Sequence, residues 1–161
     1  MPSVIFHVRG KKFRPEIELA KTKLKAYRIH HVGEVIKRKR GDFVYKDSGF
    51  CVRIGSKNNE DLTVQIKAVA KFVKKHFAEI KRLKNADDKT LDFGYSMRFD
   101  KTGEPFWVQS NKLPTEFLKL CGDLKIGIEL SFYYCFTVNK LISHYVKVFK
   151  LKYPKRKRTG K

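Results

Sequence analysis

The sequence contains no run of about 18 apolar residues, so nothing in it predicts a helix that crosses a membrane. Its first residues, Met1 to His7, lack the charged, apolar and small-residue zones of a secretory signal peptide. These absences argue against a membrane-spanning protein and against a secreted one. We therefore expect a cytoplasmic location.

Cysteine is scarce, with three residues in a chain of 161. Cys51, Cys121 and Cys135 are odd in number and far apart, and no two of them form a CxxC pair. Such a set encodes neither a disulfide scaffold nor a zinc ribbon. We expect free, buried thiols.

The local motifs of several enzyme classes are also absent. The sequence has no GxSxG nucleophile elbow, no HExxH zinc motif, no GxxxxGK phosphate loop, no GxGxxG fingerprint and no zinc-deaminase signature. Of the five histidines only His30 and His31 are adjacent, and neighbours in a strand point to opposite sides. We therefore assign no catalytic residue, no metal site and no cofactor. An enzyme whose site is assembled from distant residues stays open as an alternative, with His30, His31, Glu34 and Asp42 as its first candidates.

Positive charge is what the chain has in excess. Lys and Arg number 37 against 16 Asp and Glu, which gives a formal net charge of +21. Residues 139–161 carry nine basic residues and no acidic one. The apolar fraction of 42% suffices for a packed core, because a domain of about 150 residues buries roughly 70% of its extended-chain surface. We predict one folded domain over residues 1–138 and a basic C-terminal extension over residues 139–161.

Hydrophobic periodicity predicts a chain of mixed helices and strands. A first helix begins near Pro15 and places Ile17, Ala20, Leu24 and Tyr27 at helical spacing. Residues 28–36 are ambiguous. We expect strands at 4–8, 43–45, 50–54, 91–99, 106–109 and 126–136, and further helices at 60–84 and 114–122.

This order predicts an α+β fold with a mainly antiparallel sheet and helices packed on one face. Its first part has the ferredoxin-like β-α-β-β-α-β order, followed by a further β-α-β. On the polar sides of the strands, Asp92, Arg98 and Glu129 are expected to form cross-strand ion pairs.

A set of local features is shared with a known family: Gly10 after the first strand, Phe13-Arg14-Pro15-Glu16-Ile17, Arg40-Gly41-Asp42, Ser48-Gly49-Phe50, the long middle helix, and Leu113-Pro114 with Phe117-Leu118. In these features the chain resembles a bacterial family of small α/β proteins that is known only as a domain of unknown function and includes immunity-type proteins. After Ser-Gly, where the family pattern leads us to expect an aromatic residue such as Trp, this chain has Phe50. The resemblance covers most of residues 3–135 and implies the fold more than any chemistry.

Three basic segments provide groups that can neutralise a polyanion. They are the run at residues 37–40, the polar side of the helix at 60–84, and the C-terminal extension. The candidate binding residues are Lys37, Arg38, Lys39, Arg40, Lys67, Lys71, Lys74, Lys147, Lys150, Lys152, Lys155, Arg156, Lys157 and Arg158.

The missing catalytic motifs and the net charge favour a noncatalytic binding protein of immunity type that engages an acidic partner, a toxin or another protein. The first alternative is a nucleic-acid-binding protein that uses the basic tail and the basic helix face. Two further readings concern the tail alone. Residues 139–152 have the pattern of a basic amphipathic helix that could contact a peripheral anionic membrane surface, and residues 154–158 have the form of a nuclear-import signal.

Overall fold

The computed structural model describes residues 4–39, 41–55, 61–96 and 112–133. These residues form seven strands and four helices within one compact unit. The strands are β1 (Val4–Gly10), β2 (Arg28–His30), β3 (Val35–Ile36), β4 (Phe43–Val44), β5 (Ser48–Ile54), β6 (Asp88–Ser96) and β7 (Gly127–Tyr133), and the helices are α1 (Pro15–Ala20), α2 (Leu62–Lys75), α3 (Phe77–Arg82) and α4 (Thr115–Asp123).

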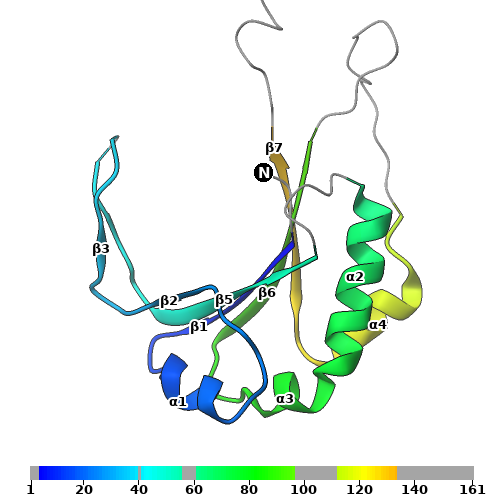
Figure 1. Cartoon of the computed structure of the whole chain (residues 1–161), viewed down its shortest axis with the longest axis horizontal. Coiled ribbons are helices and arrows are strands. Elements are labelled where there is room, and N and C mark those ends of the chain that lie inside the picture. Colours follow the sequence, from blue (N-terminus) through cyan, green and yellow to red (C-terminus); the bar gives the residue numbers. More distant parts are fainter. Residues whose placement is uncertain (1–3, 40, 56–60, 97–111, 134–161) are drawn as a thin grey trace, which may run out of the picture. The chain divides into compact units, whose positions relative to one another are not determined.

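Five strands form one mixed sheet in the order β2-β5-β1-β6-β7 (Figure 1). The pairs β2–β5, β5–β1 and β1–β6 are antiparallel, whereas β6 and β7 are parallel. A parallel pair needs a crossover connection, and α4 lies in the segment between these two strands. The predicted α+β class and the mainly antiparallel sheet are therefore confirmed.

The ferredoxin-like order is not confirmed. The ambiguous segment contributes β2 and β3, and β4 follows before the chain returns to the sheet as β5. The central strand β1 has an antiparallel neighbour on each side. The strand predicted at 106–109 and the domain boundary predicted at residue 138 lie outside the described residues.

The core lies on one face of the sheet. Along β1, the side chains of Val4, Phe6 and Val8 are buried, and strand alternation sends the residues between them to the other face. Helices α2, α3 and α4 contribute buried residues to the same core cluster. Ring contacts join the layers, with Phe72 of α2 against Phe6 and Phe117 of α4 against Phe93. The helices therefore cover the face that carries the apolar residues.

The helix predicted over residues 60–84 was wrong in its continuity, because it is divided into α2 and α3 at His76. The backbone of His76 has φ −107° and ψ 18°, outside the helical region. Its ring bonds the Glu79 carboxylate and packs against the ring of Phe72. No Gly or Pro marks this break, so periodicity alone runs through it. The start of α2 is capped by Asp61, whose carboxylate accepts the Thr63 and Val64 N–H groups.

The first helix was predicted too long. It ends at Ala20, and Thr22 directs the chain away from it: the Thr22 hydroxyl donates to the Leu19 carbonyl and accepts the Leu24 N–H. Such side-chain bonds to the backbone compete with helical ones. Leu24 is buried beyond the helix, while Ile17 is 46% exposed and does not face the core.

Strands β3 and β4 form a separate two-stranded sheet, here called the arm and defined as residues 31–39 and 41–47 (Figure 1). Two further backbone bonds extend its ladder: the Gly33 N–H donates to the Tyr45 carbonyl and the Tyr45 N–H to the Glu34 carbonyl. Gly33 has a φ of +83°, a left-handed conformation that favours glycine. The arm thus connects β2 to β5 as a ribbon with a defined register.

Candidate binding site on the open sheet face

The face of the sheet opposite the core is polar and is called the open face below. It carries His7 and Arg9 from β1, whose register partners on β5 and β6 point the same way. His7 pairs with Cys51 and Thr90, and Arg9 pairs with Gly49 and Asp88. From β2, Arg28 and His30 join this face, since they pair with Cys51 and Gly49.

His7 and Cys51 form a side-chain pair near the middle of this face. The Cys51 thiol lies 3.3 Å from His7 Nδ1, a distance at which it donates a hydrogen bond to a neutral imidazole. Burial lowers the pKa of His7 and raises the pKa of the Cys51 thiol. Both shifts oppose the thiolate and imidazolium forms. The pair is therefore neutral near pH 7, and Cys51 lacks the activation that a nucleophilic thiol requires.

His30 anchors the arm to the sheet. Its ring stacks on Tyr45 with centroids 4.1 Å apart and an interplanar angle of 23°. Its Nε2 lies 3.4 Å from the Asp47 carboxylate, while its buried Nδ1 has no hydrogen-bond partner within the described part of the chain. Burial lowers the pKa of His30, although Asp47 opposes that shift. Asp47 also lies 4.0 Å from the Arg9 guanidinium, which bonds Asp88 more closely at 2.7 Å.

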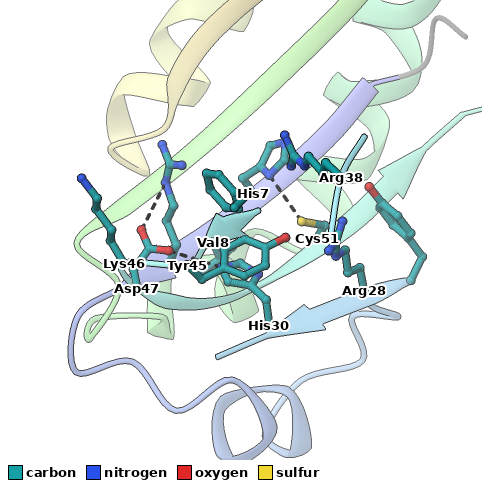
Figure 2. A pocket seen from close by; sticks show the side chains of 12 residues that line it. His7, Val8, Arg28, His30, Arg38, Tyr45, Lys46, Asp47 and Cys51 are labelled. Carbon is teal, nitrogen blue, oxygen red and sulfur yellow. Dashed lines mark hydrogen bonds and ion pairs between the residues drawn. The ribbon is translucent and has the colours of Figure 1, made fainter. Parts of the chain in front are cut away.

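A pocket of about 390 Å³ lies between the open face and the arm, within the size range of small-ligand sites (Figure 2). Its charged lining consists of four cationic side chains and one carboxylate: Arg9, Arg28, Arg38, Lys46 and Asp47. Rings complete the wall, contributed by His7, Tyr27, His30, Phe43 and Tyr45. The pocket is thus strongly cationic and partly aromatic.

Two of the pocket arginines rest on rings. The Arg28 guanidinium lies 5.5 Å from the centroid of Tyr45, and that of Arg38 lies 4.7 Å from the centroid of Phe43. Phe43 and Tyr45 in turn meet edge to face. Burial raises the pKa of the Tyr45 hydroxyl, and both arginines act against this rise, which places the two cations around the same ring.

The structure brings one predicted polyanion-binding residue, Arg38, into the pocket. Lys37 and Lys39 are exposed on the arm, and Arg40 lies outside the described residues. Lys67, Lys71 and Lys74 are exposed along α2 and belong to a different surface. The seven predicted tail residues also lie outside the described part: Lys147, Lys150, Lys152, Lys155, Arg156, Lys157 and Arg158.

Sequence reasoning missed most of the pocket. Arg28 and Lys46 have no Lys or Arg within two positions in the sequence, and Arg9, although near Lys11 and Lys12, lies outside the basic segments that were identified. The one local signal was the alternation of Phe43 and Tyr45 beside the basic run at 37–40. Only strand pairing brings these positions together.

The four residues first considered for an enzyme site do not share the pocket. His30 lines it, whereas His31 is exposed and interacts with Glu34 and Glu16. Asp42 is exposed on the arm. Asp92 and Glu129 are direct register partners of like charge on β6 and β7. Arg98, the cation of the predicted ion pairs, lies outside the described residues, so those pairs stay a prediction.

The described residues contain no cluster of three His, Cys, Asp or Glu side chains that could hold a metal ion. The same part of the chain contains no helix with the length and apolar character needed to span a bilayer.

These features define a small α+β domain with a mixed, mainly antiparallel sheet, one face covered by helices and the other carrying a cationic pocket. The chain belongs to the family DUF4279, described as a domain of unknown function, whose model matches residues 2–135. This confirms the predicted resemblance to a domain of unknown function. Comparison with curated proteins and with solved structures finds no match in either set. The bacterial origin and the immunity role expected from the resemblance stay predictions.

Proposed function

We propose that this protein is a noncatalytic binding protein that engages an acidic protein partner through the open face and the arm. The observation that carries the proposal is the pocket between them, where Arg9, Arg28, Arg38 and Lys46 face a single carboxylate, Asp47. Complementary charge gives such a surface both a faster encounter and a defined register with an acidic partner.

The arm adds apolar contact area to this charge. Val32, Val35, Phe43 and Val44 of the arm are 57%, 53%, 41% and 48% exposed, and apolar residues exposed together, unlike single ones, are typical of interaction surfaces. Protein interfaces combine aromatic and arginine residues in this way, with apolar groups at the centre and polar ones around them. A nucleic acid would use the cations but gain little from exposed valines. The mixture therefore favours a protein partner.

The neutral state of the His7–Cys51 pair supports a binding role. A nucleophilic pair needs a thiol with a lowered pKa, and burial moves both groups the other way. In an immunity-type protein the acidic partner would be a toxin that is neutralised in a stable complex. The proposal that the partner is a toxin rests on the family resemblance, whereas the cationic pocket supports only the proposal that the partner is acidic.

Two variants with the same loss of charge test which surface binds. One is Arg28→Gln/Arg38→Gln/Lys46→Gln, at the pocket, and the other is Lys67→Gln/Lys71→Gln/Lys74→Gln, on α2. We expect the pocket variant to weaken binding of a short poly-glutamate peptide about tenfold or more, since loss of about 1.4 kcal/mol has that effect. The α2 variant should bind nearly as the wild type does. Fluorescence anisotropy of the labelled peptide measures both, and equal losses would show attraction to net charge rather than a site.

A second candidate function is nucleic-acid binding, which we infer from helix α2. No acidic residue occurs between Leu62 and Lys75, and Lys67, Lys71 and Lys74 are exposed at helical spacing on one side. The measurement is the same anisotropy assay with a labelled single-stranded RNA at rising salt. This function predicts a steep salt dependence and the larger loss in the α2 variant, with a further loss on removal of residues 139–161. Binding that ignores salt would rule it out.

A further inference from the structure

Within the described part of the chain, one of the three pocket arginines is paired with a carboxylate and two are not. Arg9 donates to Asp88 at 2.7 Å. Arg28 and Arg38 have no carboxylate oxygen within 4.0 Å among the described residues. Their guanidinium groups are instead held by rings, at 5.5 Å from Tyr45 and 4.7 Å from Phe43. Two unpaired cations therefore line a cavity in a domain that has carboxylates elsewhere on the same face.

We propose that the pocket is a binding site for a single oxyanion, a carboxylate or a phosphate group, held by Arg28 and Arg38. This inference rests on the proposed function, because it names the group through which an acidic partner would be recognised. The proposed site consists of pocket residues alone. It does not include the lysines of α2, or Lys37 and Lys39 of the arm.

The ring contacts prepare the two arginines for such a ligand. A guanidinium stacked on an aromatic face keeps its N–H groups at the edge, where they can form paired hydrogen bonds to two oxygens of one anion. Tyr45 supports one arginine and contacts the ring that supports the other. In Figure 2 the side chains of Arg28 and Arg38 lie on the side of the pocket where the Tyr45 hydroxyl points. Both cations are thus oriented before any ligand arrives.

The rest of the lining leaves the charge of the arginines available. The floor is the His7–Cys51 pair, which is neutral because its thiol donates to an uncharged imidazole. The single carboxylate, Asp47, faces His30 Nε2 at 3.4 Å and Arg9 at 4.0 Å. Asp47 therefore interacts with His30 and Arg9, and it does not neutralise Arg28 or Arg38. Among the described lining residues, no second carboxylate is present to repel an anion.

The volume of the pocket fits more than an isolated ion. About 390 Å³ is within the range of sites that hold small organic ligands, so the oxyanion can enter together with the group that carries it. A glutamate side chain from a partner protein meets this description, and so does a phosphorylated small molecule. The two sources share the same recognition chemistry and are separated by experiment.

The test uses the full chain and two simple probes, inorganic phosphate and N-acetylglutamate. NMR spectra of the arginine Nε–H groups are recorded during titration, together with backbone amides. We expect saturable shifts that include Arg28 and Arg38, and a loss of affinity of about tenfold in Arg28→Gln and in Arg38→Gln. Stronger binding of N-acetylglutamate indicates a carboxylate ligand, and stronger binding of phosphate indicates a phosphorylated one.

Arg53→Gln is the matched control. Arg53 also lies over a ring, 4.6 Å from the centroid of Tyr27, and is exposed, but it does not line the pocket. This variant should bind both probes as the wild type does. Arg28→Lys keeps the charge and loses the paired geometry, so it should bind as weakly as Arg28→Gln.

Three results would overturn the inference: no saturable binding of either probe, an equal loss in Arg53→Gln, or full binding by Arg28→Gln and Arg38→Gln. Its failure differs from failure of the proposed function. If poly-glutamate binds through the pocket surface while neither small probe binds, the function stands and the oxyanion site does not. If the small probes bind and poly-glutamate does not, the oxyanion site stands and the protein-binding role fails.

Discussion

The two faces of the five-stranded sheet are built from alternate residues of the same strands, yet they differ in almost every physical property. On β1, Val4, Phe6 and Val8 are at most 1% exposed beneath the helices, whereas Arg9 is exposed on the other side. The covered face is apolar and is closed by packing. The open face has ion pairs, a thiol–imidazole pair and a pocket. One face therefore stabilises the domain by packing, and the other carries the surface for which we propose a binding role.

The open face is itself divided by charge. Its β6–β7 side carries Asp88, Asp92 and Glu129, with the last two directly paired across the strands. Its opposite side, beside β2 and the arm, carries Arg28 and Arg38. An acidic group that approaches this face is repelled at one side and attracted at the other. The face can therefore orient an acidic partner as well as attract it.

Removal of a core ring should give the largest effect. Phe6→Ala leaves a cavity beneath α2, because the Phe6 side chain is fully buried and contacts Phe72. We expect the free energy of unfolding to fall by about 3–5 kcal/mol. The adjacent open-face variant His7→Ala loses one hydrogen bond and should cost about 1 kcal/mol. Urea unfolding measures both, and similar losses in the two variants would remove the contrast between the faces.

A close approach of strands on the open face should give the next largest effect. A Cβ at Gly49 would meet the Val8 carbonyl oxygen and lie 2.8 Å from His30 Cε1. We expect Gly49→Ala to cost about 1–3 kcal/mol, because overpacked neighbours must move. Gly127→Ala is the control, since a Cβ there meets nothing closer than 3.5 Å. Equal stability of the two variants, measured by thermal unfolding, would contradict the close packing at Gly49.

The histidines of the open face should make stability depend on pH. Burial lowers the pKa of His7 and of His30 in the folded protein below 6.5, the ordinary value for histidine. As pH falls below 6.5, these histidines therefore take up protons in the unfolded chain before they do so in the folded protein. Their contribution is therefore complete above that value and is lost as pH falls through the window between the unfolded and folded pKa values. Asp47 limits the effect at His30 by opposing its shift. Urea unfolding between about pH 7 and pH 5 checks this, with His30→Gln expected to flatten the profile.

The pocket arginines should have the smallest effect on stability. Arg28 and Arg38 are exposed, and their ring contacts contribute at most about 1 kcal/mol each. We expect Arg28→Gln and Arg38→Gln to unfold within about 1 kcal/mol of the wild type while they lose anion binding. A larger loss of stability, measured by urea unfolding, would mean that these residues hold the arm in place.

The sequence predicted the parts of the fold that depend on local patterns. The alternation of Val4, Phe6 and Val8 predicted both the first strand and its buried face. The same reasoning failed where a side chain, rather than the spacing, ended an element, as at Thr22 after α1 and at His76 after α2. These endings depend on one or two specific hydrogen bonds. A periodicity summed over many residues does not register them.

The candidate site was much less predictable than the fold. His7 and Cys51 are 44 residues apart in the sequence, and their side chains meet only because β1 and β5 pair with that register. The basic run at residues 37–40 identified Arg38 as a candidate. It did not predict that Arg38 lines the pocket while Lys37 and Lys39 do not. A basic run shows how much charge is present. It does not show which of its members faces a cavity.

The sequence by itself determined that this protein is a strongly basic α+β domain with an apolar strand face and an amphipathic helix to cover it. Those properties follow from composition and from periods of two and 3.6 residues, which are local. Only the tertiary structure decided that β1 is central, that the arm returns over the open face, and that Arg28 and Arg38 meet rings rather than carboxylates. Long-range strand pairing makes those choices, because it joins residues that no local pattern relates.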